Sequence, residues 1–291
     1  MARALSNREM DSVVVFAANP SAFSTSETNH GVEAAARKRR FLLNIVSLDE
    51  SDMDSVKAPV RMGLSIRPAG VIVYEYDRAG IAALEYIPKD MPMVVVGGSF
   101  GDGEYQVINA ERDGGRWMTM HLLDLGHRTV FHVGRPEGPT DNTRTNGWRD
   151  ALKERGVTAP DPIIVPDDDL EESVKAGRTL GRRGDVTAIF AGNDETAIAV
   201  IRGLREVGRR VPADVSVVGF DDRNFGAMWN PALTSYTQNF LDMGERSFRM
   251  LFEQIQAKRA GDDAPPSQVE VVQGKPCLRA SERAYGDGEI A

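Results

Sequence analysis

The sequence predicts an α/β fold of two doubly wound lobes, each with a parallel sheet, and three observations lead to this prediction. Short apolar runs alternate with amphipathic segments along nearly the whole chain, as strands and helices do when helices cover both faces of a parallel sheet. A single sheet holding all of these strands, about ten, would be unusually wide. The chain has 291 residues, of which 41% are hydrophobic, so it is long enough to fill two separate cores.

The expected strands are the short apolar runs, which lack the alternation of a half-exposed strand. They are Ser12–Ala18, Phe41–Ser47, Gly70–Tyr74, Met93–Gly97, Arg128–Gly134, Ile163–Val165, Ala188–Ala191 and Val215–Phe220. Two further β-like pieces are expected towards the end, at Val269–Val272 and Cys277–Leu278.

The expected helices are the segments whose apolar residues recur three and four positions apart. They are Thr25–Arg40, Glu111–Leu125, Asn142–Arg155, Leu170–Arg182, Asp194–Val207 and Leu241–Ala257. Ser24 and Glu27 have the spacing of a capping box at the start of the first helix. That helix ends in the basic run Arg37–Arg40, which complements the helix dipole and indicates a solvated surface.

Composition excludes several classes of protein. No apolar run approaches the roughly 20 residues of a membrane helix, and Val13–Ala18 is too short for the apolar region of a secretory signal. The single cysteine, Cys277, allows no intramolecular disulfide and fits a reducing cytoplasm. The four histidines and one cysteine show no metal-ligand spacing, so neither a metal nor another cofactor is expected. The net charge of −8 argues that this polypeptide alone does not bind nucleic acid.

Polar residues follow two consecutive strands within Ala188–Phe240. Asn193 and Asp194 come after the first strand, and Asp221 and Asp222 come after the second. The carboxyl ends of strands form the edge of an open α/β sheet where ligands bind. Asn193 could instead only cap the helix that follows it. The two aspartates could cap a turn, although a carboxylate pair is unfavourable there without a cationic or hydroxyl partner.

Arg144 is the candidate cationic partner. It lies near the first turn of a predicted helix, where a positive charge opposes the helix dipole. Its guanidinium suits bidentate contact with carboxylates or with adjacent hydroxyls of a sugar. A surface ion pair with Asp141 or Asp113 would explain Arg144 without any ligand. No serine–histidine–aspartate or cysteine–histidine arrangement can be assembled, so nothing in the sequence demands catalysis.

Three segments resemble the core of LacI/GalR-type transcriptional regulators. They are GNDETAIAVIRGLREVGRRVPADVSVVGFDD, NPALTSYTQNF and HLLDLGHRTVFHVG, and the similarity extends from about Ala4 to Ser281. The resemblance implies the fold of type I periplasmic binding proteins, with two lobes joined by three crossings and a small ligand in the cleft. It also implies that a helix-turn-helix head and a hinge helix should precede the opening ARALSNREMDSVVVF. The chain is therefore expected to be an effector-binding core made without its head, or a headless relative.

The resemblance sets the expected crossings near Gly126–His127, Thr237–Gln238 and Ser267–Val269. The domain boundaries follow from these crossings. Residues 1–11 are expected to be a residual hinge or linker, 12–126 with 238–268 the N-terminal lobe, 127–237 with 269–283 the C-terminal lobe, and 284–291 a disordered tail.

The ligand-binding residues implied by the resemblance come from both lobes. They are Asn19, Phe23, Asp113, Arg144, Asn193, Asp221, Gln238 and Phe240. The chain departs from the family pattern at Ala110 and Glu111, where many members have an Asp-Asn pair. It also carries Glu171 and Glu172 where relatives often place an aromatic residue.

The predicted function is therefore sensing, not catalysis. A small effector, sugar-like or another polyol, would bind between the lobes of a cytoplasmic homodimeric repressor and change its geometry allosterically. Operator DNA would be bound only through the missing head, and no membrane partner is expected. The alternative is the solute-binding protein of a sugar transporter, which shares the fold but should carry a secretory or lipoprotein signal. An α/β enzyme is a third class, for which the sequence offers neither a nucleophile nor a metal set.

Overall fold

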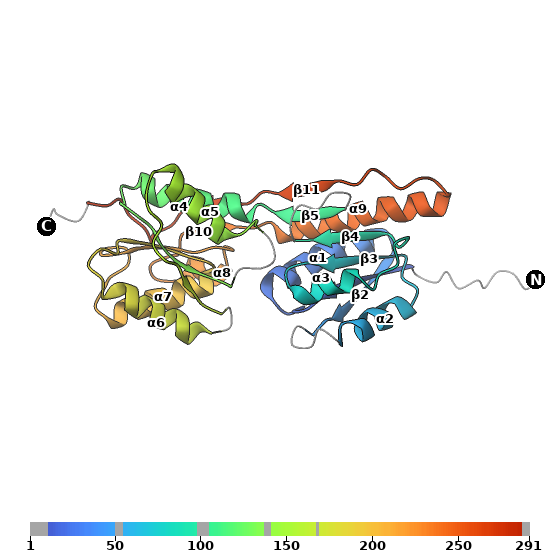
Figure 1. The fold of residues 1–291 in the computed structure, drawn as a ribbon, viewed down its shortest axis with the longest axis horizontal. Helices are drawn as coiled ribbons and strands as arrows, with labels where there is room; N and C mark the ends of the chain where they lie inside the picture. Colours follow the sequence, from blue (N-terminus) through green and yellow to red (C-terminus); the bar gives the residue numbers. More distant parts are fainter. Residues whose placement is uncertain (1–10, 50–54, 98–104, 137–140, 167–168, 287–291) are drawn as a thin grey trace, which may run out of the picture. The chain divides into compact units, whose positions relative to one another are not determined.

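The computed structural model describes residues 11–49, 55–97, 105–136, 141–166 and 169–286. The chain forms two compact units, each with its own parallel sheet and hydrophobic cores (Figure 1). Unit 1 is Met1–Asn109 with Asn239–Val272, and unit 2 is Ala110–Gln238 with Gln273–Ala291. The chain thus passes between the units three times, as predicted, and the predicted fold class is confirmed. No helix in the described ranges is long and apolar enough to cross a membrane.

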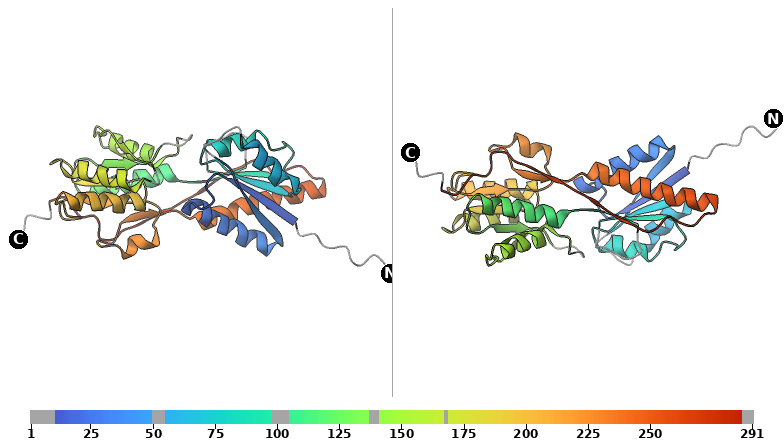
Figure 2. Two further views of the ribbon diagram at one scale, coloured as in Figure 1. Left: turned by 90° about the horizontal axis from the view of Figure 1, so that it is seen from below. Right: turned by 90° about the horizontal axis from the view of Figure 1, so that it is seen from above.

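Unit 1 is built on a six-stranded parallel sheet in the order β11-β5-β4-β3-β1-β2. Its strands are β1 (Asp11–Ala17), β2 (Phe41–Ser47), β3 (Gly70–Tyr74), β4 (Met93–Val96), β5 (Gln106–Asn109) and β11 (Val269–Val272). Its helices are α1 (Phe23–Lys38), α2 (Lys57–Ser65), α3 (Arg78–Leu84) and α9 (Phe240–Ala260). Helices α1 and α9 cover one face of this sheet, and α2 and α3 cover the other (Figure 2).

Strand β1 shows why the middle of a central strand is continuously apolar. Val13 and Val15 point into the core shared with α1 and α9, whereas Val14 and Phe16 point into the core shared with α2 and α3. Because helices cover both faces, none of these four positions faces water. The continuous apolar runs of the sequence follow from this arrangement.

Unit 2 is built on a four-stranded parallel sheet in the order β7-β6-β8-β9. Its strands are β6 (Phe131–Gly134), β7 (Ile163–Ile164), β8 (Ala188–Ala191) and β9 (Ser216–Val218), and β10 (Ser235–Thr237) pairs antiparallel with β12 (Lys275–Cys277). Its helices are α4 (Glu111–Asp124), α5 (Arg144–Glu154), α6 (Leu170–Gly181), α7 (Asp194–Glu206) and α8 (Asn224–Met228). Residues of α6 and α7 fill one core of this unit, and residues of α4 and α5, with the fully buried Trp148, fill the other.

The first predicted boundary between the lobes is wrong. The structure places it after Asn109 rather than after residue 126, because α4 packs against α5 in unit 2. Gly147 permits the close approach, since a Cβ there would lie 2.0 Å from the carbonyl oxygen of Arg112. The third boundary shifts as well, because Val269–Val272 pairs with β5 and so belongs to unit 1. The second boundary moves by one residue, which leaves Gln238 in unit 2.

The predicted tail begins too early. The backbone N–H of Tyr285 donates to the carbonyl oxygen of Leu125 (2.8 Å), and the Tyr285 ring lies against that of His127. Residues 284–286 are therefore ordered, whereas 287–291 lie outside the described residues. At the other end, Asp11 is the first residue of β1 instead of the last residue of a linker, and residues 1–10 lie outside the described ranges.

The predicted capping box is also absent. Helix α1 begins at Phe23 with Ala22 as its N-cap residue and no side-chain cap, so Ser24 lies inside the first turn. Helices α2, α3 and α8 and strands β5 and β10 were not predicted; all are short.

Candidate functional site

Unit 2 gathers polar side chains at the carboxyl ends of its strands. Arg144 begins α5 after β6, Asn193 and Asp194 follow β8, Asp221 follows β9, and Gln238 follows β10. Parallel strands bring their carboxyl ends to one edge of the sheet. The topology therefore assembles, in one unit, most of the polar residues that the resemblance assigned to ligand binding.

Arg144 is the centre of this arrangement and is only 7% exposed. Its Nε and Nη2 atoms donate to the two carboxylate oxygens of Glu111, at 3.3 and 3.1 Å, and its Nη2 lies 3.1 Å from Oδ1 of Asp221. Its Nη1 donates to the carbonyl oxygen of Gly192, and its guanidinium carbon lies 4.3 Å from the centre of the Phe220 ring. Arg144 is thus buried and forms ion pairs with Glu111 and Asp221. The alternative had instead proposed an ion pair on the surface. We call Glu111, Arg144, Asp221 and Gln238 the unit 2 cluster.

Asp221 and Asp222 diverge instead of forming one carboxylate pair. Oδ1 of Asp221 accepts from the side-chain amide of Gln238 (2.6 Å), whereas Asp222 pairs with Arg279 (2.6 Å). Both aspartates have left-handed backbones, with φ of 94° and 51°. Two successive non-glycine residues in this region are unfavourable and persist only where surrounding contacts fix them.

The other two unit 2 predictions have mixed outcomes. The side-chain oxygen of Asn193 accepts from the backbone N–H of Thr196 (2.8 Å) and caps α7, so the capping interpretation is confirmed. Asp113 lies exposed in the first turn of α4. Burial, and secondarily the Asp113 charge, raise the pKa of Tyr236. A ligand role for either residue stays a prediction.

His132 on β6 is a buried aromatic residue that the sequence did not single out. Its ring stacks on Trp148 and Phe190, and its nitrogens bond the Phe190 carbonyl oxygen (2.8 Å) and the Thr145 hydroxyl (3.0 Å). Burial lowers the pKa of His132 to about 4, so the ring is neutral at physiological pH.

Unit 1 carries the remaining predicted residues. Phe23 and Phe240 meet edge to face with ring centres 5.8 Å apart, and Tyr74 and Tyr76 meet in the same way at 5.8 Å. We call these four side chains the unit 1 aromatic cluster. The Asn19 side chain accepts from the Ser21 hydroxyl (2.9 Å) and the Ala22 backbone N–H (3.1 Å), so here it stabilises a local turn.

The two tyrosines of this cluster were missed. The Tyr74 hydroxyl donates to Asn29 (2.7 Å), and the Tyr76 hydroxyl faces the sulfur of Met243 (3.4 Å). Burial, with the neighbouring Tyr76, raises the pKa of Tyr74 well above its ordinary value. The sequence carried a signal for both, because Tyr74 ends a predicted strand and Tyr76 follows it, at the edge where ligands bind.

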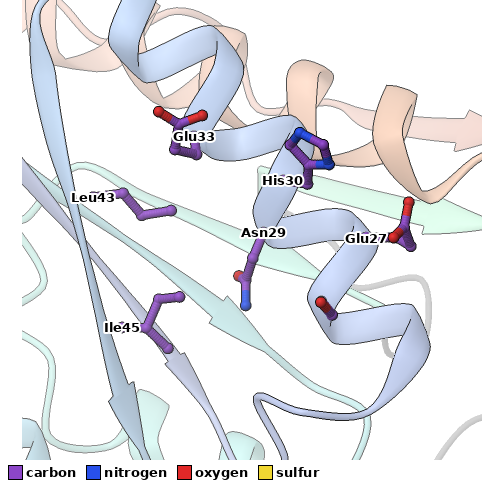
Figure 3. Close-up of a pocket in the computed structure, with 7 residues that line it drawn as sticks. Glu27, Asn29, His30, Glu33, Leu43 and Ile45 are labelled. Carbon is purple, nitrogen blue, oxygen red and sulfur yellow. The ribbon is translucent and has the colours of Figure 1, made fainter.

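A surface hollow of about 410 Å³ lies elsewhere on unit 1, between α1 and the edge strand β2 (Figure 3). Glu27, His30 and Glu33 of α1 and Leu43 and Ile45 of β2 line it. None of the predicted ligand residues lines this hollow. Within the described ranges, no group of three or more histidine, cysteine, aspartate or glutamate side chains could hold a metal ion.

Comparison with known proteins identifies the family to which this chain belongs. Residues 119–281 match the periplasmic binding protein-like domain family. The chain is 30% identical over 278 residues to the HTH-type transcriptional repressor PurR of Yersinia enterocolitica, covering 93% of this chain and 80% of that protein. The chain belongs to the LacI/GalR family of transcriptional regulators. PurR of Proteus mirabilis is similarly 30% identical over 276 residues.

Solved structures of LacI-type regulators share the fold. The complex of the transcriptional regulator CelR with cellobiose has a TM-score of 0.79 at 26% identity, over 94% of this chain and 85% of that one. The lac repressor dimer bound to operator and an anti-inducer has a TM-score of 0.80 at 22% identity, over 96% of each chain. The predicted family is confirmed, and so is the prediction that this is not an enzyme, since the PurR relatives are transcriptional repressors and CelR is a transcriptional regulator. The chain corresponds to the effector-binding core of such a regulator.

Proposed function

We propose that this LacI-type core senses a small, neutral, hydroxyl-rich molecule such as a sugar or another polyol. The supporting observation is that one buried guanidinium, Arg144, is shared between two carboxylates, Glu111 and Asp221. Its three nitrogens already face protein oxygens. The unit 2 cluster therefore offers a ligand mainly acceptors and a net negative charge.

Hydroxyl groups suit such a cluster. A carboxylate provides about four lone-pair positions, so Asp221 can accept from a ligand hydroxyl while holding Arg144 and Gln238. A carboxylate or phosphate ligand would bind one of the two bidentate edges of the Arg144 guanidinium. Glu111 occupies the Nε–Nη2 edge, and Asp221 faces Nη1 and Nη2. An anion would therefore have to displace one of these carboxylates.

The unit 1 aromatic cluster suits the same class of ligand, because aromatic rings pack against the apolar faces of sugar rings. Phe23 and Tyr76 are half-buried and offer aromatic surface, whereas Tyr74 and Phe240 are buried beneath them in the core. Glu171 and Glu172 replace the expected aromatic of unit 2. Among the relatives, CelR was solved with cellobiose, a neutral sugar. The position of the effector between the two lobes stays a prediction.

We also propose that the core acts as a homodimer whose geometry responds to the effector and sets operator affinity. Strand β2 lies at the edge of the unit 1 sheet, and Leu42 and Ile45 on it are 50% and 46% exposed. An exposed apolar edge strand calls for a covering partner. The PurR relatives are HTH-type repressors, which supports operator binding through a helix-turn-helix domain and disfavours the transporter alternative.

A thermal-shift screen tests the effector class, because a ligand that binds only the native state raises its melting temperature. Neutral sugars and polyols should stabilise the chain, and sugar acids and sugar phosphates should not. Stabilisation by anions alone would overturn the proposal. Light scattering at about tens of micromolar should give a dimer mass; a monomer mass would overturn the proposed assembly.

A further inference from the structure

A second carboxylate, that of Asp194, lies buried next to the turn that carries Asp221. We propose that Asp194 is a positioning residue, which fixes the backbone turn at Asp221–Arg223 and thereby directs the Asp221 carboxylate towards Arg144 and Gln238. The contact of Asp221 with an effector rests on the proposed function. The positioning of Asp221 is a property of unit 2 alone and can be tested without an effector.

The turn is held by three successive backbone N–H groups. The N–H of Asp221 donates to the Tyr236 carbonyl oxygen (2.9 Å), and the N–H of Asp222 donates to the Ser235 hydroxyl oxygen (3.0 Å). The N–H of Arg223 donates to Oδ2 of Asp194 (2.6 Å). The Ser235 hydroxyl in turn donates to Oδ1 of Asp194 (2.6 Å). Two of the three N–H groups therefore depend on Asp194, one directly and one through Ser235.

Packing around Asp194 leaves the turn little freedom. Asp194 is fully buried, and a Cβ at Gly219 would lie only 2.3 Å from Oδ1 of Asp194. The backbone just before the turn thus passes directly against this carboxylate. These contacts explain how Asp221 and Asp222 keep their left-handed backbones, which need support from their surroundings.

The protonation of Asp194 provides a second test of the proposal, because the state of this carboxyl changes with pH. Burial raises the pKa of Asp194 to about 7; hydrogen bonds from Ser235 and the Arg223 N–H oppose this shift, and the charges of Asp221 and Glu195 add to it. Glu195 itself pairs with the Arg223 side chain (2.6 Å). A protonated Asp194 can still accept from the Arg223 N–H through one oxygen, but its O–H must donate to Ser235 instead of accepting from it. The resonances of the turn should therefore shift near neutrality, because the Asp194 charge and the direction of the Ser235 bond change while the turn is kept.

The experiment uses nuclear magnetic resonance of the whole chain without effector. The reporters are the Gln238 side-chain amide, which donates to Asp221, and the backbone amides of Asp222 and Arg223. In Asp194→Ala, the Gln238 resonance should move to its position in Asp221→Ala, and the two backbone amides should lose at least about tenfold of their exchange protection. Asp194→Asn, which can accept from Arg223 and donate to Ser235, should restore both reporters.

Val200→Ala is the matched control, because Val200 is fully buried in the unit 2 core. It should lower the melting temperature yet leave the reporters in place. Unchanged reporters in a folded Asp194→Ala chain would overturn the proposal, as would an equal response in Val200→Ala.

A pH titration keeps the test decisive should Asp194→Ala fail to fold. In the wild-type chain the reporters should shift with a midpoint near pH 7, the pKa of Asp194, and in Asp194→Asn they should not. A flat wild-type profile through that pH would contradict the proposal. Because no effector is present, a failed effector screen leaves these results standing.

Discussion

Both units are built on parallel sheets, but they differ at the carboxyl ends of their strands. In unit 1 these ends and the adjoining helices carry aromatic rings, namely Phe23, Tyr74, Tyr76 and Phe240. In unit 2 they carry a buried guanidinium and carboxylates. A parallel sheet fixes where such side chains gather, whereas the residue types decide what they recognise. We infer that unit 2 sets the polarity of the effector and that unit 1 provides apolar surface.

The largest expected effect comes from removing the cation of unit 2. Arg144→Ala leaves the Asp221 carboxylate, 13% exposed, without its guanidinium partner. Breaking a buried ion pair costs about 3–5 kcal/mol of stability, and effector binding should weaken by about 2–5 kcal/mol. Chemical denaturation and isothermal titration measure the two quantities. Asp221→Ala should act in the same direction.

Arg40→Ala is the control for this experiment, because Arg40 lies exposed in unit 1. Its effector affinity should equal that of the wild-type chain within error. Tight effector binding by a folded Arg144→Ala chain would break the assignment of polar recognition to unit 2.

The second expected effect is that His132 and Asp194, both in unit 2, change the stability of the chain with pH in opposite directions. The pKa of His132 is about 4 in the folded chain, against about 6.5 in the unfolded chain. The free energy of unfolding should therefore fall as the pH drops from 6.5 towards 4, because the unfolded chain takes up this proton first. The raised pKa of Asp194, about 7, does the reverse: that group destabilises the fold as the pH rises from its unfolded value of about 4 to 7. In the wild-type chain the two slopes oppose each other.

Asp194→Asn should remove the pH dependence of stability that comes from Asp194 and leave the one that comes from His132. Its stability should rise by about 3 kcal/mol between pH 4 and 6.5, where the wild-type curve is flatter. His132→Gln should show the opposite slope. Denaturant titrations across this range measure both, and identical curves for all three chains would contradict the two pKa assignments.

The third expected effect concerns unit 1. Phe23→Ala removes the edge-to-face contact with Phe240 and should weaken effector binding by about 1 kcal/mol. The loss should be the same for neutral ligands of different hydroxyl pattern, because a ring face does not read hydrogen bonds. A change of ligand preference in this variant would contradict the different roles assigned to the two units.

The smallest expected effect is a change of selectivity from Glu111→Gln. Glu111 is 30% exposed, so its pairing with Arg144 contributes about 1 kcal/mol. The variant should gain affinity for a sugar acid relative to the matching neutral sugar by about fivefold. Glu154→Gln, which removes an exposed partner of Arg116, is the matched control and should change neither affinity.

Much of the fold could be predicted from the sequence, since strands buried on both faces give continuous apolar runs. Strands Phe41–Ser47, Gly70–Tyr74 and Ala188–Ala191 match the structure residue for residue. Helices α2 and α3 were missed because each is short and contains a glycine or proline that weakens the helical signal. The first boundary was misplaced because the packing of α4 on α5 depends on contacts between distant segments, such as Gly147 with Arg112.

The site was predictable where a residue conflicts with its local structure. Arg144 stood out because a cation at a helix start opposes the dipole. Glu111 did not, because an acidic residue in the first turn of a helix already has a local explanation, and its partner lies 33 residues away. The sequence placed Asp194 among the polar residues at the strand ends, but only the fold shows Arg223 and Ser235 bonded to it.

The selectivity of the wild-type chain tests the central claim most directly. Isothermal titration would compare the best neutral sugar or polyol from the screen with its carboxylate analogue under identical conditions. If Glu111 and Asp221 leave the unit 2 cluster negative, the neutral compound should bind at least about tenfold more tightly, a difference of about 1.4 kcal/mol. Tighter binding of the carboxylate would show that Arg144 is available to anions, and would contradict the account.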